Sequence, residues 1–117
     1  MDNSELDDIL TAVREFVREK VVPLETQVED EDAFPDAIIK ESAEMGLFGW
    51  ALPEQYGGLG LNAEQDALLA MELGYTTPSF RSLFGTNNGI AGQVLVNYGT
   101  DDQKSEWLPR LASGEVV

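Results

Sequence analysis

The stretch L-P-E-Q-Y-G-G-L-G-L at residues 52–61 decides how this chain is organised. It holds three glycines, Gly57, Gly58 and Gly60, and glycine tolerates positive φ and close approach of other backbone. Pro53 fixes its own φ and offers no N–H donor. Because apolar side chains are interspersed, the stretch predicts a packed, irregular loop that joins two helical halves. The alternative is a plain connector with no further role.

Composition limits the fold and the chemistry. The chain has 117 residues, a length typical of one domain, and 43% of them are apolar, as in globular proteins. It has no cysteine and no histidine, which excludes disulfides, thiol nucleophiles, the Ser-His-Asp triad and zinc sites of the usual ligand types. We therefore expect no metal site. The absence of cysteine is compatible with a cytoplasmic protein, and we expect that location.

The net charge of −15, from 22 acidic and 7 basic residues, argues against two classes of partner. An acidic surface repels nucleic acid and anionic membranes, and the alternative interpretation of the acids is a solvated face. The acidic start is not that of a signal peptide, and no apolar run approaches the roughly 18 residues that span a bilayer. We expect neither nucleic acid binding nor a membrane span.

Helical periodicity and capping signals predict an all-α domain of about five helices around the central Gly-rich loop. No partner strand is evident for the apolar run 47–51, which we expect to be buried and extended. The other signals are a helix start at Ser4, an interruption at Pro23, Pro35 at a first helical position, stops at Gly46, Gly74, Gly99 and Gly114, and caps at Asn62 with Gln65 and at Thr100 with Gln103.

The helix expected over 80–98 has two unlike faces. Apolar side chains predict a core face, made of Leu83, Ile90, Ala91, Val94 and Tyr98 with Phe84 and Leu95 at its edge. Small or weakly polar residues make the other face: Ser82, Gly85, Thr86, Gly89, Gly92 and Gln93. Glycine inside a helix costs about 1 kcal/mol relative to alanine. Close approach of a ligand or of another helix would offset that cost, and the sequence leaves both open.

Two motifs resemble one known family. L-P-E-Q-Y-G-G-L-G-L at 52–61 is similar to the loop of the acyl-CoA dehydrogenase N-terminal domain, and G-T-D-D-Q-K-S-E-W-L-P-R-L-A-S-G-E at 99–115 resembles the segment that closes that domain. R-E-F-V-R-E-K-V-V-P at 14–23 and Phe34-Pro35 stand where the family has its first helix and the entry to its second. The resemblance covers the chain from about Ile9 to its end.

The resemblance implies that residues 1–117 are the first part of a longer FAD-dependent flavoprotein. A flavin-binding β-domain and a C-terminal helical domain with the catalytic base would follow. The whole enzyme would dehydrogenate an acyl-CoA between its α and β carbons and pass electrons to an electron-transfer flavoprotein. We also expect a homo-oligomer. The 117-residue chain alone is expected to be inactive and not to hold FAD.

By position, the resemblance assigns the wall of the acyl pocket to Ser82, Thr86 and Ile90, with Gly85 and Gly89 widening the space beside them. Such small side chains should admit a long or bulky acyl group. We assign no catalytic residue: Glu72 and Glu106 stand in ordinary helical contexts, and the family places its base outside this segment. The flavin contacts stay unassigned.

Two alternatives remain at the level of sequence. One is an oxidase or flavin monooxygenase of the same superfamily, which uses oxygen as the electron acceptor. The other is a free-standing acidic helical module that binds a partner.

Overall fold

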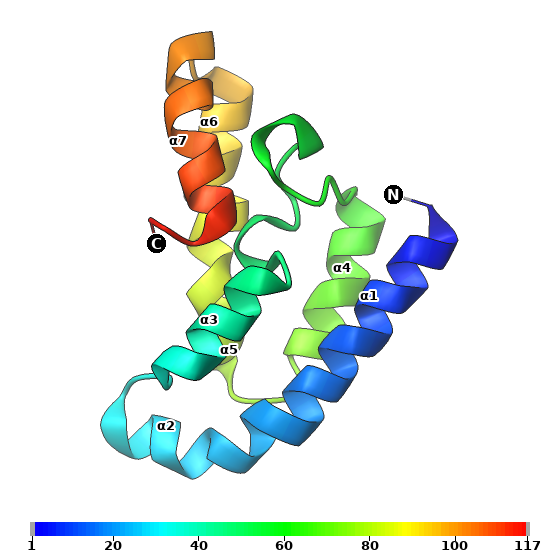
Figure 1. The fold of residues 1–117 in the computed structure, drawn as a ribbon, viewed down its shortest axis with the longest axis vertical. Helices are drawn as coiled ribbons and strands as arrows, with labels where there is room; N and C mark the ends of the chain where they lie inside the picture. Colours follow the sequence, from blue (N-terminus) through cyan, green and yellow to red (C-terminus); the bar gives the residue numbers. More distant parts are fainter. Residues whose placement is uncertain (1, 117) are drawn as a thin grey trace.

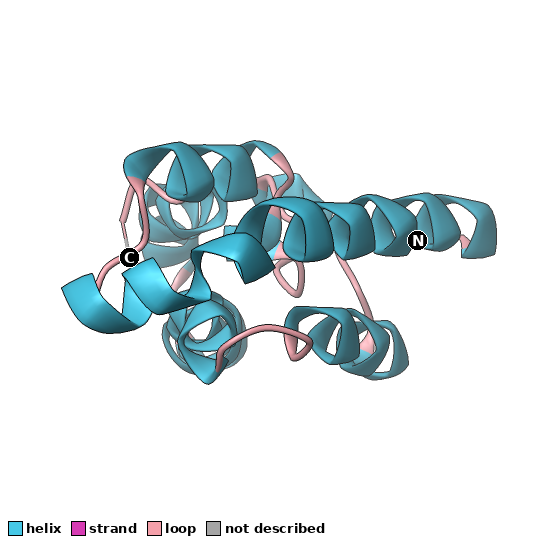
Figure 2. Ribbon diagram, turned by 90° about the horizontal axis from the view of Figure 1, so that it is seen from below, coloured by secondary structure: helices cyan, strands magenta, loops and turns pink. Residues whose placement is uncertain are grey.

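The structure, a computed structural model that describes residues 2–116, contains helices and turns and no strand in that range (Figure 1, Figure 2). Its described helices form five continuous rods. These are α1 (Asn3–Phe16), which continues through the π-helix η1 (Val17–Val21) and the 3-10 turn η2 (Val22–Leu24) into α2 (Glu25–Glu31); α3 (Asp36–Glu44); α4 (Ala63–Leu73); α5 (Pro78–Gly85), which continues through the π-helix η5 (Thr86–Ala91) into α6 (Gly92–Tyr98); and α7 (Asp101–Ser113). The predicted all-α fold with about five helices is confirmed.

The rods pack as a flat body of 42 × 33 × 19 Å. In Figure 1, α1 and α4 run side by side, and α6 and α7 pair at the other edge. Two short 3-10 turns, η3 (Leu47–Gly49) and η4 (Glu54–Tyr56), occupy the centre between these pairs. No described helix has the length and apolar content to cross a lipid bilayer.

Capping residues fix most helix ends where the sequence predicts them. Asn62 with Gln65, and Thr100 with Gln103, form complete capping boxes at the starts of α4 and α7. The first helix begins earlier than Ser4, because the Asp2 carboxylate accepts a hydrogen bond of 2.8 Å from the Glu5 N–H. Pro35 precedes α3 as its N-cap and is not its first helical residue.

The central Gly-rich loop is packed, as predicted. The N–H groups of Leu59, Gly60 and Leu61 donate to backbone carbonyls of residues 49, 52 and 50. A Cβ on Gly58 would lie 2.1 Å from the Leu52 carbonyl oxygen, so only glycine fits there. The expectation of an extended run at 47–51 was wrong: η3 is a 3-10 turn, since Gly46 at φ 80° reverses the chain and the Gly49 N–H bonds to the Gly46 carbonyl.

The core is largely aromatic and aliphatic. The main cluster joins side chains from α1, α4, α5 and the segment 47–51 around η3, called the central turn below. Phe48 and Phe80 each pack edge-on against Phe84, at ring-centre distances of 4.9 and 5.0 Å. A smaller cluster seats α7 against the loop through Leu52, Leu108, Leu111 and Ala112. The loop therefore contacts both halves of the domain.

The predicted core face of the 80–98 helix was wrong in part. Ile90, Val94 and Tyr98 expose 68%, 56% and 85% of their surface. Phe84, which was predicted at the edge of that face, is buried, and the other buried positions are taken by Phe80, Asn87, Asn88 and Gly92. Two asparagines lie in the core because their amides bond to backbone groups of the central turn and of α7. Apolar periodicity does not predict buried asparagines, so the predicted core face is rotated around the helix axis from the face that is buried in the structure.

Candidate functional site

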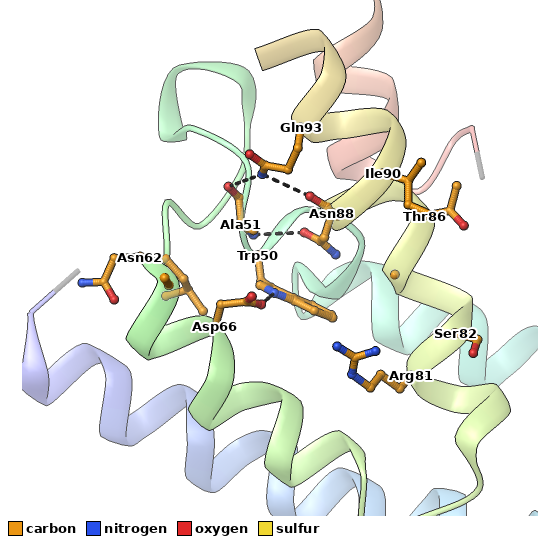
Figure 3. Close-up of a pocket in the computed structure, with 14 residues that line it drawn as sticks. Trp50, Ala51, Asn62, Asp66, Arg81, Ser82, Thr86, Asn88, Ile90 and Gln93 are labelled. Carbon is orange, nitrogen blue, oxygen red and sulfur yellow. Dashed lines mark hydrogen bonds between the residues drawn. The ribbon is translucent and has the colours of Figure 1, made fainter. Parts of the chain in front are cut away.

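A groove of about 570 Å³ lies between the α5–η5–α6 rod and the turn that leads into α4 (Figure 3). All five predicted wall residues line it: Ser82, Gly85, Thr86, Gly89 and Ile90. The same rod adds Arg81, Asn88 and Gln93, and the opposite side consists of Trp50, Ala51, Leu61, Asn62, Ala63 and Asp66. A groove of this size and mixed lining is typical of small-molecule sites.

The glycines of the rod fall into two kinds. A Cβ on Gly85 or Gly89 would meet nothing within 4 Å, so both positions face open space in the groove. A Cβ on Gly92 would lie 2.1 Å from the Asn87 carbonyl oxygen and 2.5 Å from the Leu52 side chain. Gly92 thus serves close packing, whereas Gly85 and Gly89 leave room beside the wall. Close packing thus explains Gly92, although its neighbour is the Leu52 side chain of the central loop and not another helix. A ligand beside Gly85 and Gly89 stays a prediction.

The opposite side of the groove is braced by polar contacts. The Trp50 indole N–H donates to the Asp66 carboxylate, which joins the central turn to the first part of α4. Trp50 is buried and Asp66 half-buried, and the bond uses the indole donor that a buried tryptophan must satisfy. This bond fixes the edge of the indole at the rim of the groove.

The floor between the two sides is an amide network (Figure 3). The Asn88 side chain accepts a hydrogen bond of 3.0 Å from the Ala51 N–H and donates to the Leu47 and Phe84 carbonyls at 2.9 and 3.1 Å. Gln93 Nε2 donates to the Ala51 carbonyl at 3.4 Å and to the Asn88 carbonyl at 3.1 Å. Both amides therefore meet at Ala51.

Charge on the groove is sparse. Arg81 is the one basic side chain in its lining, and Asp66 the one acid. Residues 78–98, which form the α5–η5–α6 rod, contain no acid, although the chain carries 22. Arg81 has no ion pair within residues 2–116, and in Figure 3 its guanidinium extends from α5 toward the Trp50 side of the groove. The groove is thus an acid-poor site in an acidic domain.

Glu72 and Glu106, to which the sequence assigns no catalytic role, lie outside the groove lining. Glu72 pairs with Arg14 at 2.9 Å and joins α4 to α1. The hydrogen bonds from Arg14 lower the pKa of Glu72 below its ordinary value of 4.5, against an opposing effect of burial. Glu106 is exposed on α7. Within residues 2–116, no group of three or more potential metal-binding side chains comes together.

The fold and the site together define the class of protein: an all-helical domain with a groove of small residues along one long helix. Residues 3–115 match the family described as acyl-CoA dehydrogenase, N-terminal domain, and the chain belongs to that family.

Individual relatives agree with this assignment. A (2S)-methylsuccinyl-CoA dehydrogenase from Cereibacter sphaeroides is 38% identical over 117 residues, which cover 98% of this chain and 21% of that protein. A glutaryl-CoA dehydrogenase from Mycobacterium smegmatis, solved with FADH2, superposes with a TM-score of 0.85 at 32% identity over all of this chain and 30% of its own. An acyl-CoA dehydrogenase from Bacillus anthracis, solved with FAD, gives a TM-score of 0.83 at 32% identity over 97% of this chain and 19% of its own. The chain spans 19% to 30% of the length of these three proteins.

Sequence reasoning missed the side of the groove that faces the rod. Trp50, Ala51 and Asp66 come from segments that carry no binding motif, and only the packing of the central turn brings them to the groove. Arg81 was a detectable signal, since it is the one charge in residues 78–98. The Asn87-Asn88 pair was another, because asparagine is a poor residue for a helix interior.

Proposed function

We propose that this chain is the substrate-side N-terminal domain of an FAD-dependent acyl-CoA dehydrogenase. The observation that carries the proposal is the open groove along Ser82, Thr86 and Ile90, on a domain whose relatives were solved with flavin and are named for acyl-CoA substrates. The flavin-binding β-domain and the C-terminal helical domain with the catalytic base would lie outside residues 1–117. We assign no flavin contact and no catalytic residue to this chain.

In this proposal the domain orients the acyl group and keeps water from it. FAD, when bound, supplies the chemistry, by accepting the hydride that leaves the β-carbon of the acyl group. Thr86 and Ile90 would contact the acyl chain, and the gaps beside Gly85 and Gly89 would admit a bulky or branched one. Holding the acyl group in one geometry is the domain's contribution to the rate.

The charge in the groove points to an acyl group that ends in a carboxylate. Arg81 has no ion pair within residues 2–116 and stands on an acid-free rod, so a substrate carboxylate would be its natural partner. Methylsuccinyl and glutaryl groups, for which two of the relatives are named, both carry such a carboxylate. The proposed substrate is therefore a dicarboxylic acyl-CoA.

Replacing Arg81 tests this substrate class. In the full-length protein, Arg81→Met should lower kcat/KM for methylsuccinyl-CoA or glutaryl-CoA about tenfold or more, because a hydrogen bond to a charged group contributes about 1.5–3 kcal/mol. The value for an uncharged acyl-CoA of the same length should stay nearly constant. Lys40→Met is the matched control, since it removes one positive charge from an exposed site on α3 that lies outside the groove. Equal losses for both substrates would reject the carboxylate partner.

A broader test separates the proposed function from its alternatives. The full-length protein should purify with FAD, and an acyl-CoA should bleach the flavin absorbance under anaerobic conditions. Fast reoxidation by air would identify an oxidase or monooxygenase. A full-length protein without flavin would favour a binding module instead.

Three further features extend the proposal. We expect an electron-transfer flavoprotein as the electron acceptor, a homo-oligomeric enzyme and a cytoplasmic location. Stimulation of turnover by an added electron-transfer flavoprotein, and light scattering on the full-length protein, would check the first two.

A further inference from the structure

We propose that Asn88 is a positioning residue that sets the width of the groove by tying the π-helix η5 to the turn that carries Trp50 and Ala51. The inference rests on the proposed function only in naming the groove's occupant, an acyl group. Asn88 is itself part of the groove lining, and its side chain joins the two sides of the groove.

The hydrogen bonds of Asn88 hold its side chain in a single arrangement. The residue is 3% exposed, and both its amide donors and its amide oxygen are used within the domain. Two of the three bonds, to Leu47 and Ala51, cross from η5 to the central turn. A fully bonded buried amide of this kind specifies one relative placement of the elements that it joins.

The third bond acts on the helix itself. Asn88 Nδ2 donates to the carbonyl of Phe84, four residues earlier on the same rod. A side chain that enters the i to i−4 bonding pattern distorts a helix, and π-helical segments are frequent at functional sites. The rod is π-helical over Thr86–Ala91, the stretch that faces the groove with Thr86, Gly89 and Ile90. The same amide thus holds the distorted wall and anchors it to the other side.

Gln93 reinforces the tie one turn further along. Its amide donates to the Ala51 carbonyl, while the Ala51 N–H donates to Asn88. Both polar backbone groups of Ala51 are therefore held by side chains of the opposite wall. The separation of the two walls at this point follows from the lengths of two amide side chains.

The neighbouring residue Asn87 provides a matched comparison. It is equally buried, at 0% exposure, and belongs to the same π-helix. Its Nδ2 donates to the Leu111 and Val116 carbonyls on the side of α7, and it does not line the groove. Truncating either asparagine removes two donated bonds from the core, but only Asn88 connects the groove walls.

The experiment compares Asn88→Ala with Asn87→Ala in the full-length protein. The readout is the ratio of kcat/KM for a branched acyl-CoA to that for a short linear one, with the melting temperature measured alongside. We expect both variants to lose thermal stability. Asn88→Ala should change the ratio about fivefold or more, because a displaced wall changes the contacts by which the groove discriminates between acyl groups. Asn87→Ala should leave the ratio within about twofold.

Gln93→Met is a second variant that keeps the side-chain volume and removes both donated bonds. It should shift the ratio in the same direction as Asn88→Ala and by less, so it decides the question if Asn88→Ala does not fold. An unchanged ratio in both variants, or an equal change in Asn87→Ala, would overturn the proposal and leave Asn88 with a role in stability alone.

A readout that needs no activity separates this proposal from the proposed function. Hydrogen exchange of the Ala51 N–H, followed by mass spectrometry, should be about tenfold faster or more in Asn88→Ala than in Asn87→Ala, since only the first removes its acceptor. A wild-type protein that dehydrogenates no acyl-CoA would reject the proposed function and leave this comparison intact. Equal exchange rates in the two variants would reject the proposal that Asn88 joins η5 to the central turn.

Discussion

The two long rods of the domain both contain a π-helix, but for different physical reasons. In the first rod, η1 ends two residues before Pro23, whose backbone nitrogen cannot donate a hydrogen bond and whose ring clashes with the carbonyl four residues back. The Val22 N–H bonds to the Val17 carbonyl, five residues earlier, and the sequence-predicted interruption at Pro23 is present. A backbone constraint explains this distortion.

The second rod has no proline within or just after η5. Side-chain amides take its place: Asn88 and Gln93 bond to the central turn, and Asn87 bonds to α7. The first rod carries nine acids and three bases, whereas the second carries only Arg81. The comparison teaches that the π-helix next to a proline buries its two valines in the core, while the one held by amides forms the wall of a groove.

The largest expected effect on stability is at the end of the second π-helix. Gly92→Ala should destabilise the domain by about 3 kcal/mol, because the new methyl group would overlap the Asn87 carbonyl and the Leu52 side chain. Gly89→Ala, three residues earlier and open to the groove, should change stability by less than about 1 kcal/mol. The free energy of unfolding of each variant, measured by denaturant titration, checks these two predictions. Similar losses in the two would mean that the rod needs glycine for flexibility and not for close packing.

A smaller loss is expected in the first rod. Val17 is fully buried in η1 among apolar side chains, so Val17→Ala should cost about 2 kcal/mol through lost packing. The acyl-CoA preference of the full-length protein should be unchanged, because Val17 lies outside the groove. A shift in preference as large as that expected for Asn88→Ala would show that the two π-helices are coupled and would break the comparison.

The smallest effect concerns the ion pair that holds the first rod to α4. The lowered pKa of Glu72 means that its charged form is favoured in the folded state, so the pair contributes stability at pH values above the ordinary carboxyl pKa of 4.5. That contribution is lost as the pH falls through the lower folded-state pKa. Glu72→Gln should therefore reduce the melting temperature slightly at neutral pH, and the difference from wild type should vanish in acid. A constant difference at all pH values would exclude the charge as its cause.

The sequence predicts the fold well because its signals are local. The capping boxes at Asn62 and Thr100, the glycine stops and the Gly-rich loop all act within a few residues of the chain. The family resemblance, carried by two motifs of that kind, also places the five predicted wall residues on the groove side of the rod. Their contact with an acyl group stays a prediction.

The buried face of the same rod could not be predicted in this way. Apolar periodicity favours Ile90, Val94 and Tyr98, which are exposed, and disfavours Asn87 and Asn88, which are buried. An asparagine belongs in a core only where distant backbone groups supply its partners, here Leu47, Ala51 and Leu111. Those partners lie 24 to 41 residues away in the sequence, and only the tertiary structure brings them close.

The central claim is that the acid-free rod of α5, η5 and α6 forms the wall against which the acyl group binds. The most direct test is a series of kcat/KM values for dicarboxylic acyl-CoAs of increasing chain length, measured for Thr86→Phe in the full-length protein. Thr11→Phe, at an exposed position on α1 outside the groove, is the matched control, and flavin content and melting temperature are measured for both. The phenyl ring would fill part of the groove, so kcat/KM for long acyl-CoAs should fall at least about tenfold while short ones stay nearly unchanged. Equal losses at every chain length, or no loss at any, would contradict the account.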